Sequence, residues 1–165
     1  MGSQGTILAC VSPQVFAQTV IRPSLITIAL WNPAAEQLLL GTAIHESERF
    51  QFRKQKNGPA LGLFQMEPYT HNDVWTTYLR YRPTLASQVT SLLTNPRANK
   101  LQELEFNDKY AAAMARIKYA RSNAPLPLVN NIPAMAMYWK QYYNTAEGKG
   151  TPKQFIDDWN VMMSK

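Results

Sequence analysis

The chain has 165 residues, of which 45% are hydrophobic, 11% aromatic and only 17% charged. This composition suffices for a hydrophobic core and argues against a disordered tail or a charge-rich coiled coil, so we expect a single domain over residues 1–165. Seventeen Lys and Arg against eleven Asp and Glu give a net charge of +6, which favours an anionic partner. Because only Arg53, Lys54 and Lys56 lie close together among the basic residues, nucleic acid is not the expected partner.

Neither membrane insertion nor a disulfide framework is expected. The apolar residues around 25–40 are interrupted by Pro33 and by polar residues, so they fall short of the ~20 residues that a membrane-spanning helix needs. The single cysteine, Cys10, cannot form an internal disulfide, and we expect a buried, unreactive thiol. No Lys or Arg precedes Arg22 and the first apolar stretch is short, so we expect no signal peptide.

Prolines and capping residues divide the first half of the chain into helices. A first helix is predicted to open at Pro13 and to end or bend at Pro23, because proline lacks the amide proton that the helix needs. A second helix is predicted from Pro33 to about Ser47. Residues 48–67 are rich in glycine, proline and basic residues, which predicts a loop with room for a small β-hairpin. Loops of this kind often carry functional residues.

The second half of the chain is also predicted to be helical, which makes the fold class mainly α. Capping pairs indicate helix starts at Thr70 with Asp73 and at Thr151 with Gln154. A single capping residue indicates one at Asn107, and a proline indicates one at Pro133. A shorter helix is predicted near Thr84. The helix after Asn107 has apolar residues at 3.6-residue spacing, so we expect it in the centre of the core. The helix from Pro133 is predicted to reach about Asn144.

Glu46 is the carboxylate with the most informative position. It falls on the same helical stripe as four other residues of the predicted helix: Ala35, Leu38, Leu39 and Thr42. Its side chain should therefore point inward, near the negative end of the helix dipole, and both effects raise the pKa of a carboxyl group. A carboxyl that keeps its proton near neutrality can act as a general acid. The alternative is a solvent-facing glutamate beside Arg49.

The residues after Glu46 match a known signature. Glu46-Ser47 is followed by Phe50 and then by Ala60-Leu61-Gly62-Leu63-Phe64-Gln65-Met66-Glu67-Pro68-Tyr69-Thr70. This combination resembles the soluble lytic transglycosylases and goose-type lysozymes, in which a Glu-Ser pair precedes Ala-x-Gly-Leu-Met-Gln-x-x-Pro-x-Thr. Phe64 stands where the family usually has methionine. The family's Tyr-Asn at a helix end corresponds to Tyr143-Asn144, or the tyrosine to Tyr142 if the alignment slips by one residue.

The resemblance implies a lysozyme-like fold and a phage-encoded enzyme that cleaves the β-1,4 bond between N-acetylmuramic acid (MurNAc) and N-acetylglucosamine (GlcNAc) in peptidoglycan. Glu46 would be the general acid and then the general base, forming 1,6-anhydro-MurNAc ends without catalytic water, metal or cofactor. The resemblance and the residue types together suggest a set of substrate-binding residues: Ser47, Gly62, Phe64, Gln65, Tyr143 and Asn144. The implied partners are peptidoglycan strands and, as an open alternative, other virion proteins. The implied location is the virion or the infected host cell, where the protein would act at the cell wall.

Two other functions stay open. A hydrolytic muramidase of the same fold needs a second carboxylate near the first, for which Glu67 and Asp73 are the candidates, although Asp73 is better explained as a capping residue. A non-catalytic virion module could keep the fold for glycan binding or assembly. A metal site is not expected, because His45-Glu46 lacks a second histidine four residues later.

Overall fold

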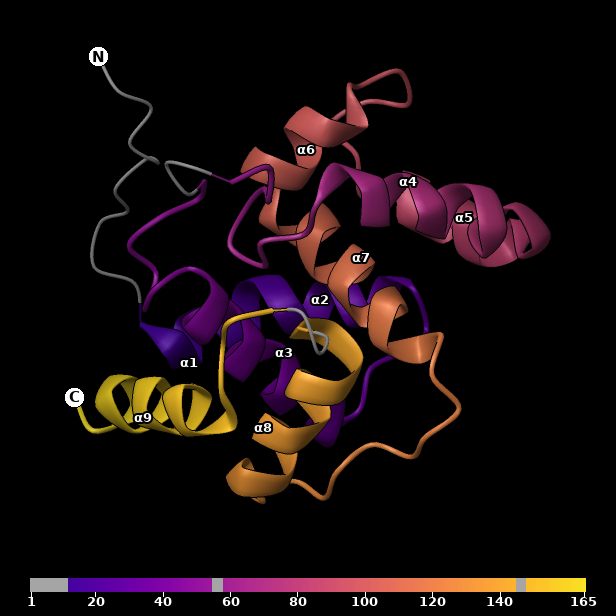
Figure 1. Cartoon of the computed structure of the whole chain (residues 1–165). Coiled ribbons are helices and arrows are strands. Elements are labelled where there is room, and N and C mark those ends of the chain that lie inside the picture. The colour runs from indigo at the N-terminus through magenta and orange to yellow at the C-terminus, as the bar shows by residue number, and fades with distance from the viewer. Residues whose placement is uncertain (1–11, 55–57, 145–147) are drawn as a thin grey trace, which may run out of the picture.

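The computed structural model describes residues 12–54, 58–144 and 148–165, and these are mainly helical (Figure 1). The prediction for Cys10 lies outside the described residues. The elements in chain order are α1 (Pro13–Phe16), a π-helix η1 (Ala17–Ile21), α2 (Arg22–Thr27), α3 (Pro33–Glu46), α4 (Pro68–Thr77), a 3₁₀-helix η2 (Leu79–Tyr81), α5 (Pro83–Thr90), α6 (Lys100–Phe106), α7 (Asp108–Ala120), α8 (Ile132–Trp139), a π-helix η3 (Lys140–Asn144) and α9 (Pro152–Met163).

Three of the predicted helix starts are confirmed by the hydrogen bonds of their capping side chains. Asn32 accepts from the amide of Ala35 at 2.7 Å, and Asn107 accepts from the amide of Tyr110 at 3.1 Å. Thr151 forms the predicted reciprocal capping box with the residue three positions later. These caps satisfy amide groups that a helix start leaves without intrahelical partners, and so they fix where α3, α7 and α9 begin.

The first helical segment does not end at Pro23, one of the two outcomes that the sequence predicted there. The π-helix η1 ends at Ile21, two residues before this proline, and α2 then carries the helical path on to Thr27. Proline has no amide proton to donate and its ring clashes with the carbonyl four residues earlier in a regular α-helix. The wider π-turn accommodates both defects, which explains why the chain stays helical there.

The predicted capping pair of Thr70 and Asp73 is wrong. Helix α4 begins at Pro68, directly after Glu67, whose side chain makes no capping hydrogen bond. Asp73 instead accepts a hydrogen bond from Arg121 at 2.9 Å, so it links α4 to the end of α7. The proline, which fits the first turn of a helix, sets the start here. The sequence also missed α6, which Asn99 caps by accepting from two backbone amides.

Helices α3 and α7 run through the middle of the molecule, with α8 and α9 packed on α3 (Figure 1). Nine residues of α7 are buried, on every side of the helix, which confirms the prediction of a central core helix. Helix α9 lies against both α3 and α8, and buries Phe155, Trp159 and Met162. Helices α4, α5 and α6 lie together on one side of α7, away from α9 (Figure 1).

The segment between α3 and α4 is a loop in its described parts, which contain two isolated antiparallel bridges and no strand. The bridges join Leu61 to Lys54 and to Met66. Leu61 and Met66 exchange two backbone hydrogen bonds of 2.9 and 3.2 Å and so close a tight turn. In the described part of this segment, the predicted small hairpin is therefore reduced to this tight turn. Among the described residues, no helix has both the length and the apolar composition to cross a membrane.

Candidate active site

Glu46 is the last residue of α3, and the chain turns sharply directly after it. Three successive residues, 48 to 50, have positive φ angles of 52° to 64°, a conformation that side chains other than glycine rarely adopt. Such strain persists only where surrounding contacts hold it, and it is common at functional sites. The turn leaves the Glu46 carboxyl facing a cleft instead of the next turn of a helix.

Ser47 supplies the contacts that hold this turn. Its hydroxyl donates to the carbonyl of Ala43 at 2.6 Å and accepts from the amide of Phe50 at 2.7 Å. The residue is fully buried and does not line the cleft. In this arrangement Ser47 ends α3 behind Glu46 through local hydrogen bonds, and the substrate contact that its residue type suggested stays a prediction.

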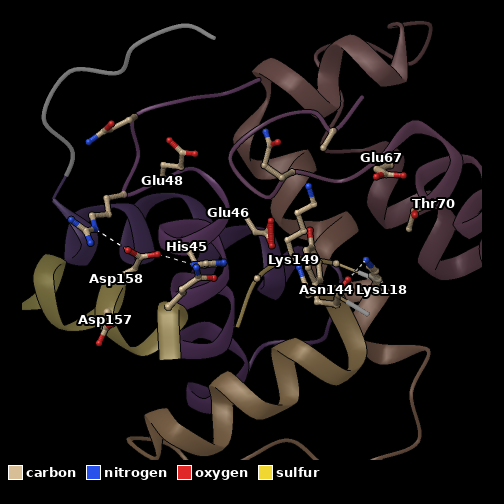
Figure 2. A pocket seen from close by; sticks show the side chains of 18 residues that line it. His45, Glu46, Glu48, Glu67, Thr70, Lys118, Asn144, Lys149, Asp157 and Asp158 are labelled. Atoms are coloured by element: carbon tan, nitrogen blue, oxygen red, sulfur yellow. Dashed lines mark hydrogen bonds and ion pairs between the residues drawn. The ribbon is translucent and has the colours of Figure 1, made fainter. Parts of the chain in front are cut away.

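The cleft has a volume of about 1120 Å³ and lies where six parts of the chain meet. Its walls are the end of α3 with the turn after it, the loop before α4, the first turn of α4, α7, η3 with residues 148–150, and α9. Figure 2 shows Glu46 in the middle of this cleft, with Glu48 and Glu67 on either side of it in the view. The lining is predominantly polar, so the cleft suits a hydrophilic ligand larger than a single sugar.

Burial raises the pKa of Glu46 from 4.5 to about 7. Two neighbours act in the opposite direction: the indole Nε1 of Trp139 donates to Oε2 of Glu46 at 3.1 Å, and the positive charge of Lys118 favours the carboxylate. Desolvation has the larger effect, because the stabilisation that the carboxylate loses with its hydration exceeds the stabilisation that it gains from Trp139 and Lys118. The group is therefore divided between its two protonation states near neutral pH, as predicted for an inward-facing carboxyl.

Lys118 contributes from α7 and was not singled out by the sequence. Its Nζ donates to the carbonyl of Tyr143 at 2.6 Å and lies 4.1 Å from the centre of that residue's ring. Burial lowers the pKa of Lys118, while Glu46 and Glu67 raise it. The ammonium group thus lies in the cleft wall at the end of η3, close enough to affect Glu46.

Gly62 and Gln65 belong to the tight turn in the loop before α4. Gly62 has a φ of +78°, and a side chain there would collide with the backbone carbonyl of Leu104, so glycine is required. The amide of Gln65 donates from Nε2 to the carbonyls of Gly62 at 2.9 Å and Arg53 at 3.1 Å. Its Oε1 atom is buried without a hydrogen-bond partner among the described residues, and the residue lines the cleft.

Phe64 and Tyr143 join this turn to η3. The ring of Phe64 is fully buried and does not line the cleft, whereas its carbonyl accepts a hydrogen bond of 2.5 Å from the Tyr143 hydroxyl. Tyr143 itself lines the cleft. Tyr142, the alternative for the motif tyrosine, packs on Tyr138 outside the cleft, with ring centres 4.5 Å apart. Of the two tyrosines, Tyr143 is therefore the one that lines the cleft.

Asn144 lines the cleft beside Tyr143, and Lys140 holds its side chain by a hydrogen bond. Lys140 donates to Oδ1 of Asn144 at 2.7 Å and to the carbonyl of Gly148 at 2.8 Å. The structure thus brings Glu46, Gln65, Tyr143 and Asn144 together around one cleft. Gly62, Ser47 and Phe64 lie behind its walls and shape them.

The structure shows contacts of ionisable residues around the cleft that the sequence did not predict. Asp158 of α9 accepts from Arg49 at 2.8 Å and is hydrogen-bonded to Nδ1 of His45 at 2.7 Å (Figure 2). Glu67 lines the cleft, whereas Asp73 does not.

The described residues contain no group of three or more side chains that could hold a metal ion. Comparisons with family models, curated proteins and solved structures found no match to this chain.

Proposed function

We propose that this protein is a peptidoglycan lytic transglycosylase of lysozyme-like fold, with Glu46 as its acid and base. The observation that carries the proposal is the Glu46 carboxyl, which faces a polar cleft and has a pKa raised to about 7. A carboxyl with this pKa can donate a proton near neutral pH and can take one back in the next step. The net charge of +6 suits a cell wall that carries carboxylates.

The reaction needs one carboxyl group and no water. Glu46 donates its proton to the glycosidic oxygen between MurNAc and GlcNAc, and the bond from this oxygen to C1 of MurNAc breaks. The C6 hydroxyl of the same MurNAc then attacks C1, while the Glu46 carboxylate takes the hydroxyl proton. The products are a GlcNAc with a free hydroxyl and a 1,6-anhydro-MurNAc end, and Glu46 is protonated again.

Gln65 and Tyr143 support the glycan as the substrate. The buried Oε1 of Gln65 has no partner among the described residues, and an unpaired buried acceptor is costly unless a ligand donor satisfies it. An N-acetyl N–H or a sugar hydroxyl can supply that donor. Because Nε2 of Gln65 is fixed by two backbone carbonyls, its Oε1 has a defined direction. Tyr143 lines the cleft beside Asn144, and its hydroxyl donates to the carbonyl of Phe64 in the turn that holds Gln65.

A hydrolytic muramidase is the second candidate, and Glu67 favours it. Inverting and retaining glycosidases place a second carboxylate about 5 to 9.5 Å from the general acid. Glu67 lines the same cleft as Glu46 and could activate a water molecule or stabilise a cation there. Asp73 cannot take this role in the observed arrangement, because it faces Arg121 outside the cleft.

Digestion of purified peptidoglycan tests the proposal. The wild-type protein should release soluble glycan fragments, and Glu46→Gln should lower the rate by about 10²- to 10⁴-fold through loss of general acid catalysis. Glu36→Gln is the matched control, since Glu36 also belongs to α3 but pairs with Arg22 away from the cleft. Equal rates for all three proteins, or no release by any of them, would contradict the proposal, and the second result would favour a non-catalytic module.

A further inference from the structure

The indole of Trp139 makes a direct hydrogen bond to the carboxyl group on which the proposed reaction depends. Trp139 is the last residue of α8 and is fully buried. Its Nε1 lies 3.1 Å from Oε2 of Glu46. An indole N–H can donate but cannot accept, so Oε2 must act as the acceptor in this bond. When Glu46 is neutral, the bond therefore favours Oε2 as the carbonyl oxygen and Oε1 as the oxygen that carries the proton.

The indole ring is itself held in place from two other elements. The His45 ring packs edge-on against it, with ring centres 4.6 Å apart and an angle of 75° between the planes. Phe155 of α9 packs on the same indole at 5.5 Å. A side chain at Gly150 would approach within 2.6 Å of the Trp139 ring, so the chain after η3 also lies against the indole.

His45 is in turn braced by α9. Its Nδ1 lies 2.7 Å from Oδ2 of Asp158, and the other oxygen of that carboxylate accepts from Nε of Arg49 at 2.8 Å. The side chains of His45 and Asp158 are only 14% and 17% exposed, so this pair is shielded from most of the solvent. Contacts from α9 thus reach Glu46 through two aromatic rings, because Asp158 bonds to His45, His45 packs on Trp139, and Trp139 donates to Glu46.

We propose that Trp139 is a positioning residue for the general acid. It holds Oε2 of Glu46, leaves Oε1 to present the proton to the substrate, and is kept in place by the His45–Asp158 pair. This inference rests on the proposed function for its role in catalysis. The hydrogen-bonded coupling between the two side chains does not depend on which reaction the protein performs, so it can be tested separately.

The charged groups near Glu46 determine how the test is read. Lys118 from α7 favours the carboxylate, as Trp139 does. Tyr119 and Tyr143 also face Glu46, but burial raises the pKa of both hydroxyls well above 10, so they remain neutral at the pH values of interest. His45 packs against the same indole, with ring centres 4.6 Å apart, so the experiment must separate effects of His45 from those of Glu46.

The first measurement is the titration of the Glu46 side-chain carboxyl by ¹³C NMR in wild type, Trp139→Phe and Trp31→Phe. Phenylalanine retains an aromatic ring but lacks the N–H, so the pKa of Glu46 should rise by about one unit in Trp139→Phe. Trp31 is a matched control, because its indole donates at 2.9 Å to another glutamate of α3, Glu36. Trp31→Phe should leave the Glu46 titration unchanged. An unchanged titration in Trp139→Phe would overturn the inference.

A second measurement applies even if Trp139→Phe fails to fold. The indole N–H resonance of Trp139 in the wild-type protein should follow the ionisation of Glu46 near pH 7 and lose this transition in Glu46→Gln. A transition of the same size in Glu46→Gln would show that it does not come from Glu46 and would contradict the coupling. The Trp31 resonance should stay constant between pH 6 and 8, since Arg22 and Trp31 hold the pKa of Glu36 below its ordinary value despite partial burial.

Kinetics then separate the inference from the proposed function. On peptidoglycan, Trp139→Phe should lower kcat about tenfold and leave KM within about twofold, as expected for an interaction that orients a proton donor. A shifted Glu46 titration without any glycan cleavage by the wild type would retain the coupling and refute the enzyme. Cleavage by the wild type with an unshifted titration would retain the enzyme and refute the role of Trp139.

Discussion

In the proposed reaction Glu46 must carry its proton at the moment the glycosidic bond breaks, so the activity should depend on the ionisation of this carboxyl. With a pKa of about 7, the protonated fraction falls tenfold for each pH unit above that value. We therefore predict that kcat/KM is level on the acidic side and declines above pH 7 with a slope of one. The measurement is the rate of glycan release at several pH values. A rate that stays constant to pH 9 would show that Glu46 is not the acid.

Removing the charge of Lys118 should shift this decline. Its ammonium group lowers the pKa of Glu46, so Lys118→Met should raise that pKa and move the alkaline limb of the profile to higher pH. Lys109→Met is a suitable control, because Lys109 is an exposed lysine near the start of the same helix. The prediction fails if the two variants have the same pH profile.

The buried carboxyl should also cost stability when it ionises. Its pKa is raised on folding, so the folded protein binds more protons than the unfolded chain between pH 4.5 and 7. This contribution to the free energy of unfolding is full below pH 4.5 and declines as the pH rises to about 7. Above pH 7, Glu46→Gln should be more stable than wild type by up to about 3 kcal/mol, as measured by urea unfolding. A glutamine variant less stable at pH 8 would refute the argument.

At the scale of elements, Asp158 links α9 to the end of α3. It interacts with His45 and Arg49 while largely shielded from water, so Asp158→Ala should destabilise the fold by about 1–2 kcal/mol. The neighbouring Asp157 pairs with Lys153 on an exposed face one helical turn away, and Asp157→Ala should cost about 0.5 kcal/mol or less. Thermal and urea unfolding of the two variants provide the comparison. Equal losses would show that the α3–α9 link contributes little.

Helix starts were predictable where a capping side chain decided them and unpredictable where tertiary contacts did. Asn32, Asn107 and Thr151 make local hydrogen bonds that their own sequence neighbourhoods specify. Asp73 has the same appearance in the sequence, but an arginine 48 positions later takes its carboxylate. The sequence left open whether Pro23 ends the first helix, and it does not, because a π-turn with no clear sequence pattern precedes it and accommodates the missing donor.

Part of the candidate site could also be predicted from the sequence, and the residues that depend on tertiary packing could not. Glu46 and Gln65 belong to two short motif segments joined by a loop, and a periodic helix precedes the first, so the sequence alone could single them out. Trp139 and Asp158 reach Glu46 and His45 only through the packing of α8 and α9, across 93 and 113 positions of sequence. The one available signal was that Trp139 lies one helical turn before Tyr143. For Ser47 the sequence did not show that its hydroxyl is buried and bonded to the backbone of Ala43 and Phe50.

For the whole molecule, the arrangement of helices places the Glu46 carboxyl in a cleft large enough for several sugar rings. The most direct measurement of the central claim is the mass of the new glycan ends after digestion of purified peptidoglycan. We predict 1,6-anhydro-MurNAc ends, one water lighter than reducing ends, with wild type and Glu36→Gln and none with Glu46→Gln. Reducing ends would show hydrolysis and point to Glu67, and the same anhydro ends from Glu46→Gln would contradict the role of Glu46 altogether.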